Sequence, residues 1–126
     1  MYHYIRSFDK KFPYFNFLHV KDFKKQNVYF KKKKGFFDLN ESITKNIKKN
    51  KILLTFDDGL KEHLNIAEYL NKKKIIGFFF IPSLPLIEND FLPVHKLHLI
   101  FGKYNSDKIK YILKKLRIKL NTKLIF

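Results

Sequence analysis

The stretch KILLTFDDGLKEHL, from Lys51 to Leu64, decides the fold. It opens with a continuous apolar run, which is typical of a strand buried on both faces of a sheet. The run ends at two adjacent carboxylates, Asp57 and Asp58, and Gly59 follows them. Beyond the glycine, apolar residues recur at helical spacing, at Leu60, Leu64, Ala67 and Leu70. The stretch therefore predicts a strand, an acidic turn and a helix, in that order.

A second apolar stretch, IIGFFFI at residues 75–81, predicts another buried strand, and the prolines at 82 and 85 predict an exit loop after it. Strand, helix and strand within about 30 residues form a βαβ unit with parallel strands. Ligands of such sheets gather beyond the carboxyl ends of the strands. Asp57 and Asp58 occupy that position, so we expect the functional site there.

The rest of the chain predicts mostly helices. MYHYI at residues 1–5 reads as a strand and residues 9–18 as a loop. A helix is predicted over residues 20–35, with Phe23, Asn27 and Phe30 on one face and Gly35 at its C-cap. Two further helices are predicted over residues 93–103 and 106–116, the second with Ser106 as N-cap and a stripe of Ile109, Ile112, Leu113 and Leu116. The tail, residues 117–126, alternates weakly.

The chain has 126 residues, 45% of them hydrophobic, which suits one packed domain. Its 27 Lys and Arg against 11 Asp and Glu give a net charge of +16. This balance raises the question of whether the chain binds nucleic acid or an anionic surface. Only Arg6 and Arg117 are arginines, whereas base readout favours arginine, so we expect no specific nucleic-acid partner. The absence of cysteine excludes disulfides, thiolate zinc sites and a cysteine nucleophile.

The paired acids have a simple chemical interpretation. Two carboxylates this close repel each other, and a divalent cation is the simplest group that keeps both ionised. One can bind the metal while the other acts as a general base. Gly59 permits unusual backbone angles, and the predicted helix places N–H groups nearby. The alternative is ordinary turn and capping chemistry, which also favours Asp-Asp-Gly before a helix.

The string LLTFDDG, followed by a helix and then by GFFFIP, resembles the polysaccharide deacetylase family, the NodB-like carbohydrate esterases. The first motif of that family reads T-F-D-D-G. The opening MYHYI and the helix at 20–35 also resemble the leader segment of some members, so the resemblance covers residues 1–82. Gly77 and Phe78 stand where the family usually has Ala and Thr.

The resemblance implies a fold and a reaction. The fold is α/β, a distorted (β/α) barrel of the NodB-homology type, here expected to be partial. The reaction removes acetyl groups from an N-acetylated sugar with a divalent metal, usually zinc. Asp57 looks like the general base and Asp58 looks like a metal ligand. The partner would be an N-acetylated glycan or a lipid-linked sugar precursor.

The family completes its metal site with a His-[Ser/Thr]-x-x-His motif, which this sequence lacks. Its histidines are His3, His19, His63, His95 and His98. His95 and His98 are three residues apart and His3 lies on the first predicted strand, so these three are candidates for additional ligands. His63 falls off the predicted apolar stripe and is expected to be exposed. The later motifs are absent too, which predicts an N-terminal portion that needs a complementing chain.

The expected organisation is a strand-and-helix leader at 1–50, the first βαβ unit at 51–82 and a helical insertion with a truncated end at 83–126. The N-terminus shows no secretory signal and no apolar run reaches the ~20 residues of a spanning helix, so a cytoplasmic location is expected. Two other functions stay open. One is a lysine-rich module for nucleic acid or anionic surfaces, and the other is an inactive remnant.

Overall fold

The computed structural model describes residues 1–39 and 50–116. The helices and strands in these ranges are β1 (Ile5–Arg6), β2 (Leu18–His19), α1 (Val20–Lys33), β3 (Leu54–Asp57), α3 (His63–Lys72), β4 (Gly77–Phe80), α4 (Leu84–Glu88), α5 (Pro93–Lys103) and α6 (Ser106–Lys115). The chain divides into two compact units. Unit 1 comprises residues 1–7 and the described part of 17–89, and unit 2 comprises residues 8–16 and the described residues from Asp90 on.

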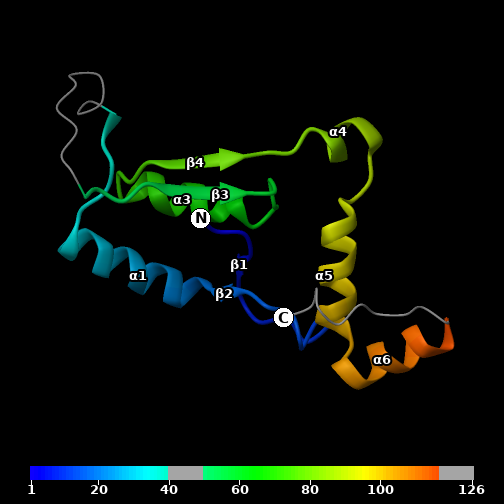
Figure 1. The fold of residues 1–126 in the computed structure, drawn as a ribbon. Coiled ribbons are helices and arrows are strands. Elements are labelled where there is room, and N and C mark those ends of the chain that lie inside the picture. Colours follow the sequence, from blue (N-terminus) through cyan, green and yellow to red (C-terminus); the bar gives the residue numbers. More distant parts are fainter. Residues whose placement is uncertain (40–49, 117–126) are drawn as a thin grey trace. The chain divides into compact units, whose positions relative to one another are not determined.

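The predicted βαβ unit is confirmed. β3 and β4 pair in parallel, with Leu54 opposite Gly77 and Asp57 opposite Phe80, and α3 connects them. Figure 1 shows β4 beside β3, with α3 running along the pair. The N-terminal residues flank β3 as well, because the Tyr2 N–H donates to the Thr55 carbonyl oxygen at 2.8 Å. The first residues of the chain therefore reach the carboxyl end of β3.

Aromatic packing builds the core of unit 1. Phe56 is fully buried, and its ring stacks on Phe79 at a centroid distance of 4.6 Å and on Tyr2 at 5.6 Å. Phe23 of α1, also fully buried, meets Tyr2 edge to face at 5.1 Å. Burying one such ring contributes about 1.5–3 kcal/mol. The core cluster comprises Ile5, Phe23, Leu54, Phe56, Ile66 and Leu70.

The expectation that both strands are buried on two faces is wrong. Leu54 and Phe56 are buried, whereas their neighbour Leu53 is 45% exposed. On β4, Phe78 and Phe80 are 38% and 58% exposed. Successive side chains of a strand point to opposite faces, and the core residues of α1 and α3 pack on the face that carries Leu54 and Phe56. The apolar run therefore forms a strand, as predicted, but only one face of this strand packs against the core.

The predicted face of the second helix is wrong in part, because Leu70 is buried as expected but Leu64 is not. α3 begins at His63 rather than Leu60, because the turn after Asp58 continues through Glu62. Its buried residues are His63, Ile66 and Leu70, while Leu64 is 68% exposed. This stripe has the helical period too, but a histidine holds one of its positions. The apolar residues alone therefore favoured the wrong phase.

The first helix agrees with its prediction. α1 buries Phe23 and Asn27, as the predicted face requires. It ends where expected, because Gly35 adopts a left-handed φ of +73° and its N–H donates to the Phe30 carbonyl oxygen at 3.0 Å. A glycine in this conformation is the usual way to end a helix.

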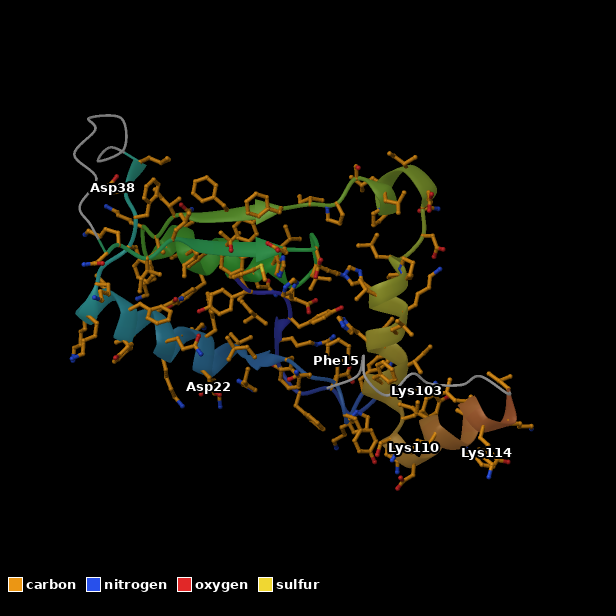
Figure 2. All side chains as sticks on the ribbon, viewed as in Figure 1. Phe15, Asp22, Asp38, Lys103, Lys110 and Lys114 are labelled. Atoms are coloured by element: carbon orange, nitrogen blue, oxygen red, sulfur yellow. The ribbon has the colours of Figure 1, made fainter. Side chains whose placement is uncertain are left out.

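Unit 2 contains α5 and α6 close to their predicted bounds. The N-cap of α6 is Asn105, whose Oδ1 accepts from the Lys108 N–H at 2.9 Å, and the expected cap Ser106 is the first helical residue. Phe15 lies beside α5, as Figure 2 shows, and a Cβ at Gly102 would stand 2.4 Å from its ring. The predicted tail at 117–126 lies outside the described residues.

Three predictions about architecture have different outcomes. The exit loop after β4 contains a short helix, α4, that was not expected. The strands of residues 1–39 and 50–116 form two parallel pairs, β1–β2 and β3–β4, so the partial (β/α) barrel stays a prediction. The predicted leader and the predicted βαβ unit share unit 1. Across the same residues, no helix combines the length and apolarity that crossing a membrane requires.

Candidate functional site

The acidic turn lies at the carboxyl end of β3, as predicted. Asp57 is the last residue of the strand, and its N–H donates to the Tyr2 carbonyl oxygen at 3.0 Å. Asp58 follows with φ +82°. Left-handed backbone costs a non-glycine residue about 1–3 kcal/mol and is concentrated at functional sites. A side chain at Gly59 would be strained, because its φ is +59° and a Cβ would stand 2.9 Å from the Ile81 side chain.

His3 meets this turn directly. Its Nδ1 lies 2.7 Å from the Asp58 Oδ2, although the two residues are 55 positions apart in the sequence. The side chains are 43% and 21% exposed, so the pair is accessible from solvent. The contact arises because Tyr2 pairs with β3 and carries the next residue to the end of that strand. Of the three candidate histidines, His3 is the one that the structure brings to the acids within unit 1.

A pocket opens beside the two acids. It has a volume of about 410 Å³ and is open to solvent. Its lining residues are Asp57, Asp58, Phe79, Phe80, Ile81 and Pro82. Small-molecule sites typically combine apolar walls with a few polar groups that fix orientation. The pocket has that composition, because it is lined by two carboxylates and by apolar residues at the end of β4.

Tyr4 reports the electrostatics of this end of the sheet. Burial, reinforced by the negative charges of Asp58 and Glu62, raises the pKa of the Tyr4 hydroxyl to about 12, and Arg6 opposes the shift. Negative charge close to a phenol disfavours phenolate, which adds a second charge of the same sign. The two carboxylates that line the pocket suit a cation, although the chain as a whole has a net charge of +16.

His63 is the residue that sequence reasoning missed. It was expected to be exposed, but it is 4% exposed and its Nε2 lies 2.7 Å from the His3 carbonyl oxygen. The reason is the phase of α3, which turns this position toward the core. A stripe counted from residue 63 instead of residue 60 would have included Ile66 and Leu70 and revealed the histidine.

His95 and His98 lie on α5 in unit 2. His95 is buried, at 8% exposed, whereas His98 is exposed, so the two rings occupy different surroundings on one helix. Their role as additional metal ligands stays a prediction. In residues 1–39 and 50–116, no group of three or more His, Asp or Glu side chains gathers closely enough to hold a metal ion.

The donor types at Asp58 and His3 fit a divalent ion such as zinc, which binds carboxylate oxygen and imidazole nitrogen. Two donors of one tetrahedral zinc ion lie ~3.4 Å apart, since each binds at ~2.0–2.2 Å. The 2.7 Å contact between them is instead a direct hydrogen bond. The two atoms must therefore move apart by less than an ångström before both can bind one ion. The remaining donors must come from elsewhere.

Comparison of the chain with protein-family models, with curated proteins and with solved structures finds no match. The acidic turn is therefore the feature from which we infer a function.

Proposed function

We propose that Asp57, Asp58 and His3 form a hydrolytic site that removes acetyl groups from an N-acetylated amino sugar with the help of a divalent metal. One observation carries this proposal. An imidazole nitrogen lies 2.7 Å from a carboxylate oxygen at the edge of an open pocket, at the carboxyl end of a parallel strand. Open α/β sheets bind their ligands at that end.

Asp58 and His3 are the residues that would hold the metal. Both belong to positions that the backbone fixes, Asp58 by its left-handed turn and His3 by the pairing of its neighbour Tyr2 with β3. A divalent ion bound there would polarise the carbonyl group of the amide and lower the pKa of a bound water. The further ligands would be supplied by a complementing chain.

Asp57 is the general base of the proposed reaction. It borders the same pocket as Asp58 and is half-buried. Its carboxylate takes a proton from water as the water oxygen bonds to the acetyl carbonyl carbon. The carbon–nitrogen bond then breaks, the sugar nitrogen receives the proton from Asp57, and acetic acid and the free amine form. The acid passes its proton to the amine, so the products that leave are acetate and an ammonium group. Atoms and charge balance without a further reactant.

The composition of the pocket and the resemblance both support this substrate class. Its lining combines the apolar side chains of Phe79, Phe80 and Ile81 with two acids. An N-acetylated sugar offers a methyl group and ring C–H surfaces to such apolar side chains and an amide to the acids. A glycan or a lipid-linked sugar precursor is the proposed partner in this setting.

The test is acetate release from N-acetylglucosamine oligomers in the presence of zinc or cobalt. We expect slow release by the natural chain and a loss of about 10²–10⁴-fold in Asp57→Asn, since that is the contribution of a general base. Asp107→Asn, which changes an exposed acid on α6, is the matched control and should keep the full rate. Equal rates in the two variants would remove Asp57 from the reaction.

The competing function, a lysine-rich module that binds nucleic acid or an anionic surface, can be tested separately. Exposed lysines are distributed over α1 of unit 1 and α6 of unit 2, and Figure 2 labels Lys110 and Lys114 on the latter. A nucleic-acid module loses affinity steeply as salt rises. Tight RNA or DNA binding with that salt dependence, together with no acetate release, would favour the binding module over the hydrolase.

A further inference from the structure

We infer that His63 is a positioning residue of this site, which holds the backbone of His3 so that the His3 imidazole reaches Asp58. The inference deepens the proposed function and rests on it for its purpose. It stands on three independent features, which are the burial of His63, the packing of its ring and the hydrogen bond that it makes to His3.

The ring of His63 has little freedom to move. It is 4% exposed and meets the ring of Phe56 at a centroid distance of 5.8 Å and the ring of Phe79 at 6.0 Å. The two phenylalanines belong to paired positions of β3 and β4. A buried side chain that contacts both of these rings has a defined direction, because well-packed interiors leave few alternative rotamers.

The hydrogen bond fixes the tautomer of His63. The His3 carbonyl oxygen can only accept, so the His63 Nε2, at 2.7 Å, carries the proton and donates. The His63 Nδ1 is buried and makes no hydrogen bond to any residue that the structure describes. A proton on Nδ1 would therefore be a buried donor without an acceptor, and the neutral Nε2–H form satisfies the geometry.

The same bond adds a second restraint on His3, from α3. Before His3, Tyr2 is tied to the strand through Thr55 and Asp57. At His3 itself, the carbonyl group is held by the donor from α3. With the backbone fixed at both points, the imidazole of His3 stands where its Nδ1 meets the Asp58 carboxylate at 2.7 Å. Ligand-orienting contacts of this kind typically change metal affinity 10–100-fold when they are removed.

Nitrogen-15 NMR of the histidine rings tests the inference. In the natural chain we expect His63 as the Nε2–H tautomer and His3 with a hydrogen-bonded proton on Nδ1. In His63→Leu, the His3 Nδ1–H signature should be lost. His63→Gln, whose amide can still donate to the His3 carbonyl oxygen, should restore it. Cobalt affinity should fall about 10–100-fold in His63→Leu and return in His63→Gln.

Ile66→Val is the matched control, because Ile66 is a buried residue of the same helix that makes no polar contact with the site. It should lower stability slightly and leave the His3 signature intact. An unchanged His3 signature in folded His63→Leu would overturn the inference and leave His63 with a packing role. If that variant does not fold, an Nδ1–H tautomer of His63 in the natural chain overturns the inference equally.

Failure of this inference and failure of the proposed function are distinguishable. Asp57→Asn should lower acetate release about 10²–10⁴-fold without changing the His3 signature, because the substitution keeps the backbone hydrogen bond from Asp57 to Tyr2. A chain that never releases acetate, but whose His3 ring responds to His63→Leu, would refute the hydrolase and support the positioning role.

Discussion

Two regions of the molecule carry the candidate histidines, and they are built in opposite ways. His3 belongs to unit 1 and meets Asp58 across 55 residues of sequence, through strand pairing. His95 and His98 belong to unit 2 and are neighbours on α5, three residues apart. The distant pair forms a 2.7 Å contact, while the local pair divides into one buried and one exposed ring.

The difference shows that proximity in sequence is a poor guide to a shared site. Residues three apart on a helix lie on neighbouring positions of its surface, yet a helix that packs on one side buries only part of that surface. A sheet brings together residues that are distant in sequence, because the ends of its strands lie at one edge. We therefore attribute the site to the sheet of unit 1.

The largest expected effect comes from Phe56→Ala, which removes the ring that contacts Tyr2, His63 and Phe79. Truncating a fully buried phenylalanine typically costs about 3–5 kcal/mol of unfolding free energy. Urea unfolding should show a loss of that size together with loss of the His3 signature. A loss below 1 kcal/mol would mean that the core does not hold the site in place.

In unit 2, Gly102→Ala should have a smaller effect, because the new Cβ would stand 2.4 Å from the ring of Phe15. Overpacking of this kind costs about 1–3 kcal/mol. Urea unfolding measures it, and the His3 signature should stay unchanged. A changed His3 signature in Gly102→Ala would show that packing in unit 2 affects the site in unit 1.

Tyr2→Phe should have a modest effect in unit 1. The ring packing is retained, but the hydrogen bond from the Tyr2 hydroxyl to the Gln26 Oε1, 2.9 Å long, is lost. A hydrogen bond of this kind contributes about 0.5–1.5 kcal/mol. Thermal unfolding of Tyr2→Phe beside Gln26→Leu checks it. Clearly additive losses in the double variant would show that the two side chains do not act as a pair.

The pH dependence of Tyr4 gives the smallest effect and the sharpest view of the acidic turn. Its pKa is raised from 10.0 to about 12 in the folded chain. Its contribution to stability is therefore complete below pH 10 and is lost as the pH rises from there through about 12. Asp58→Asn should bring this pKa down, as ultraviolet absorbance of the phenolate would show. An unchanged Tyr4 titration in Asp58→Asn would show that the Asp58 carboxylate does not act on the Tyr4 hydroxyl.

Local patterns predicted much of the fold. The helices α1, α5 and α6 and the parallel β3–α3–β4 unit follow from periodicity, and the position of Asp57 and Asp58 follows from the strand that precedes them. The sequence could not show which faces are covered. That depends on where α1 and α3 pack, so the exposure of Leu53 and the burial of His63 were both predicted wrongly.

The candidate site was predictable only in part, for the same physical reason. The left-handed turn at Asp58 has a local signal in the glycine beside it, although the positive φ of Asp58 itself was not expected. The contact of His3 with Asp58 depends on pairing between the N-terminal residues and β3. A sequence alone reports strand propensity without reporting the partner, and His3 could therefore only be a candidate.

A cobalt titration followed by its visible absorption tests the central claim most directly. It compares the natural chain with His3→Gln, Asp58→Asn and His98→Gln. Our account predicts that His3→Gln and Asp58→Asn each abolish the cobalt spectrum, while His98→Gln leaves it unchanged. Retention of the spectrum in His3→Gln and Asp58→Asn, with loss in His98→Gln, would contradict the account and move the metal site to α5.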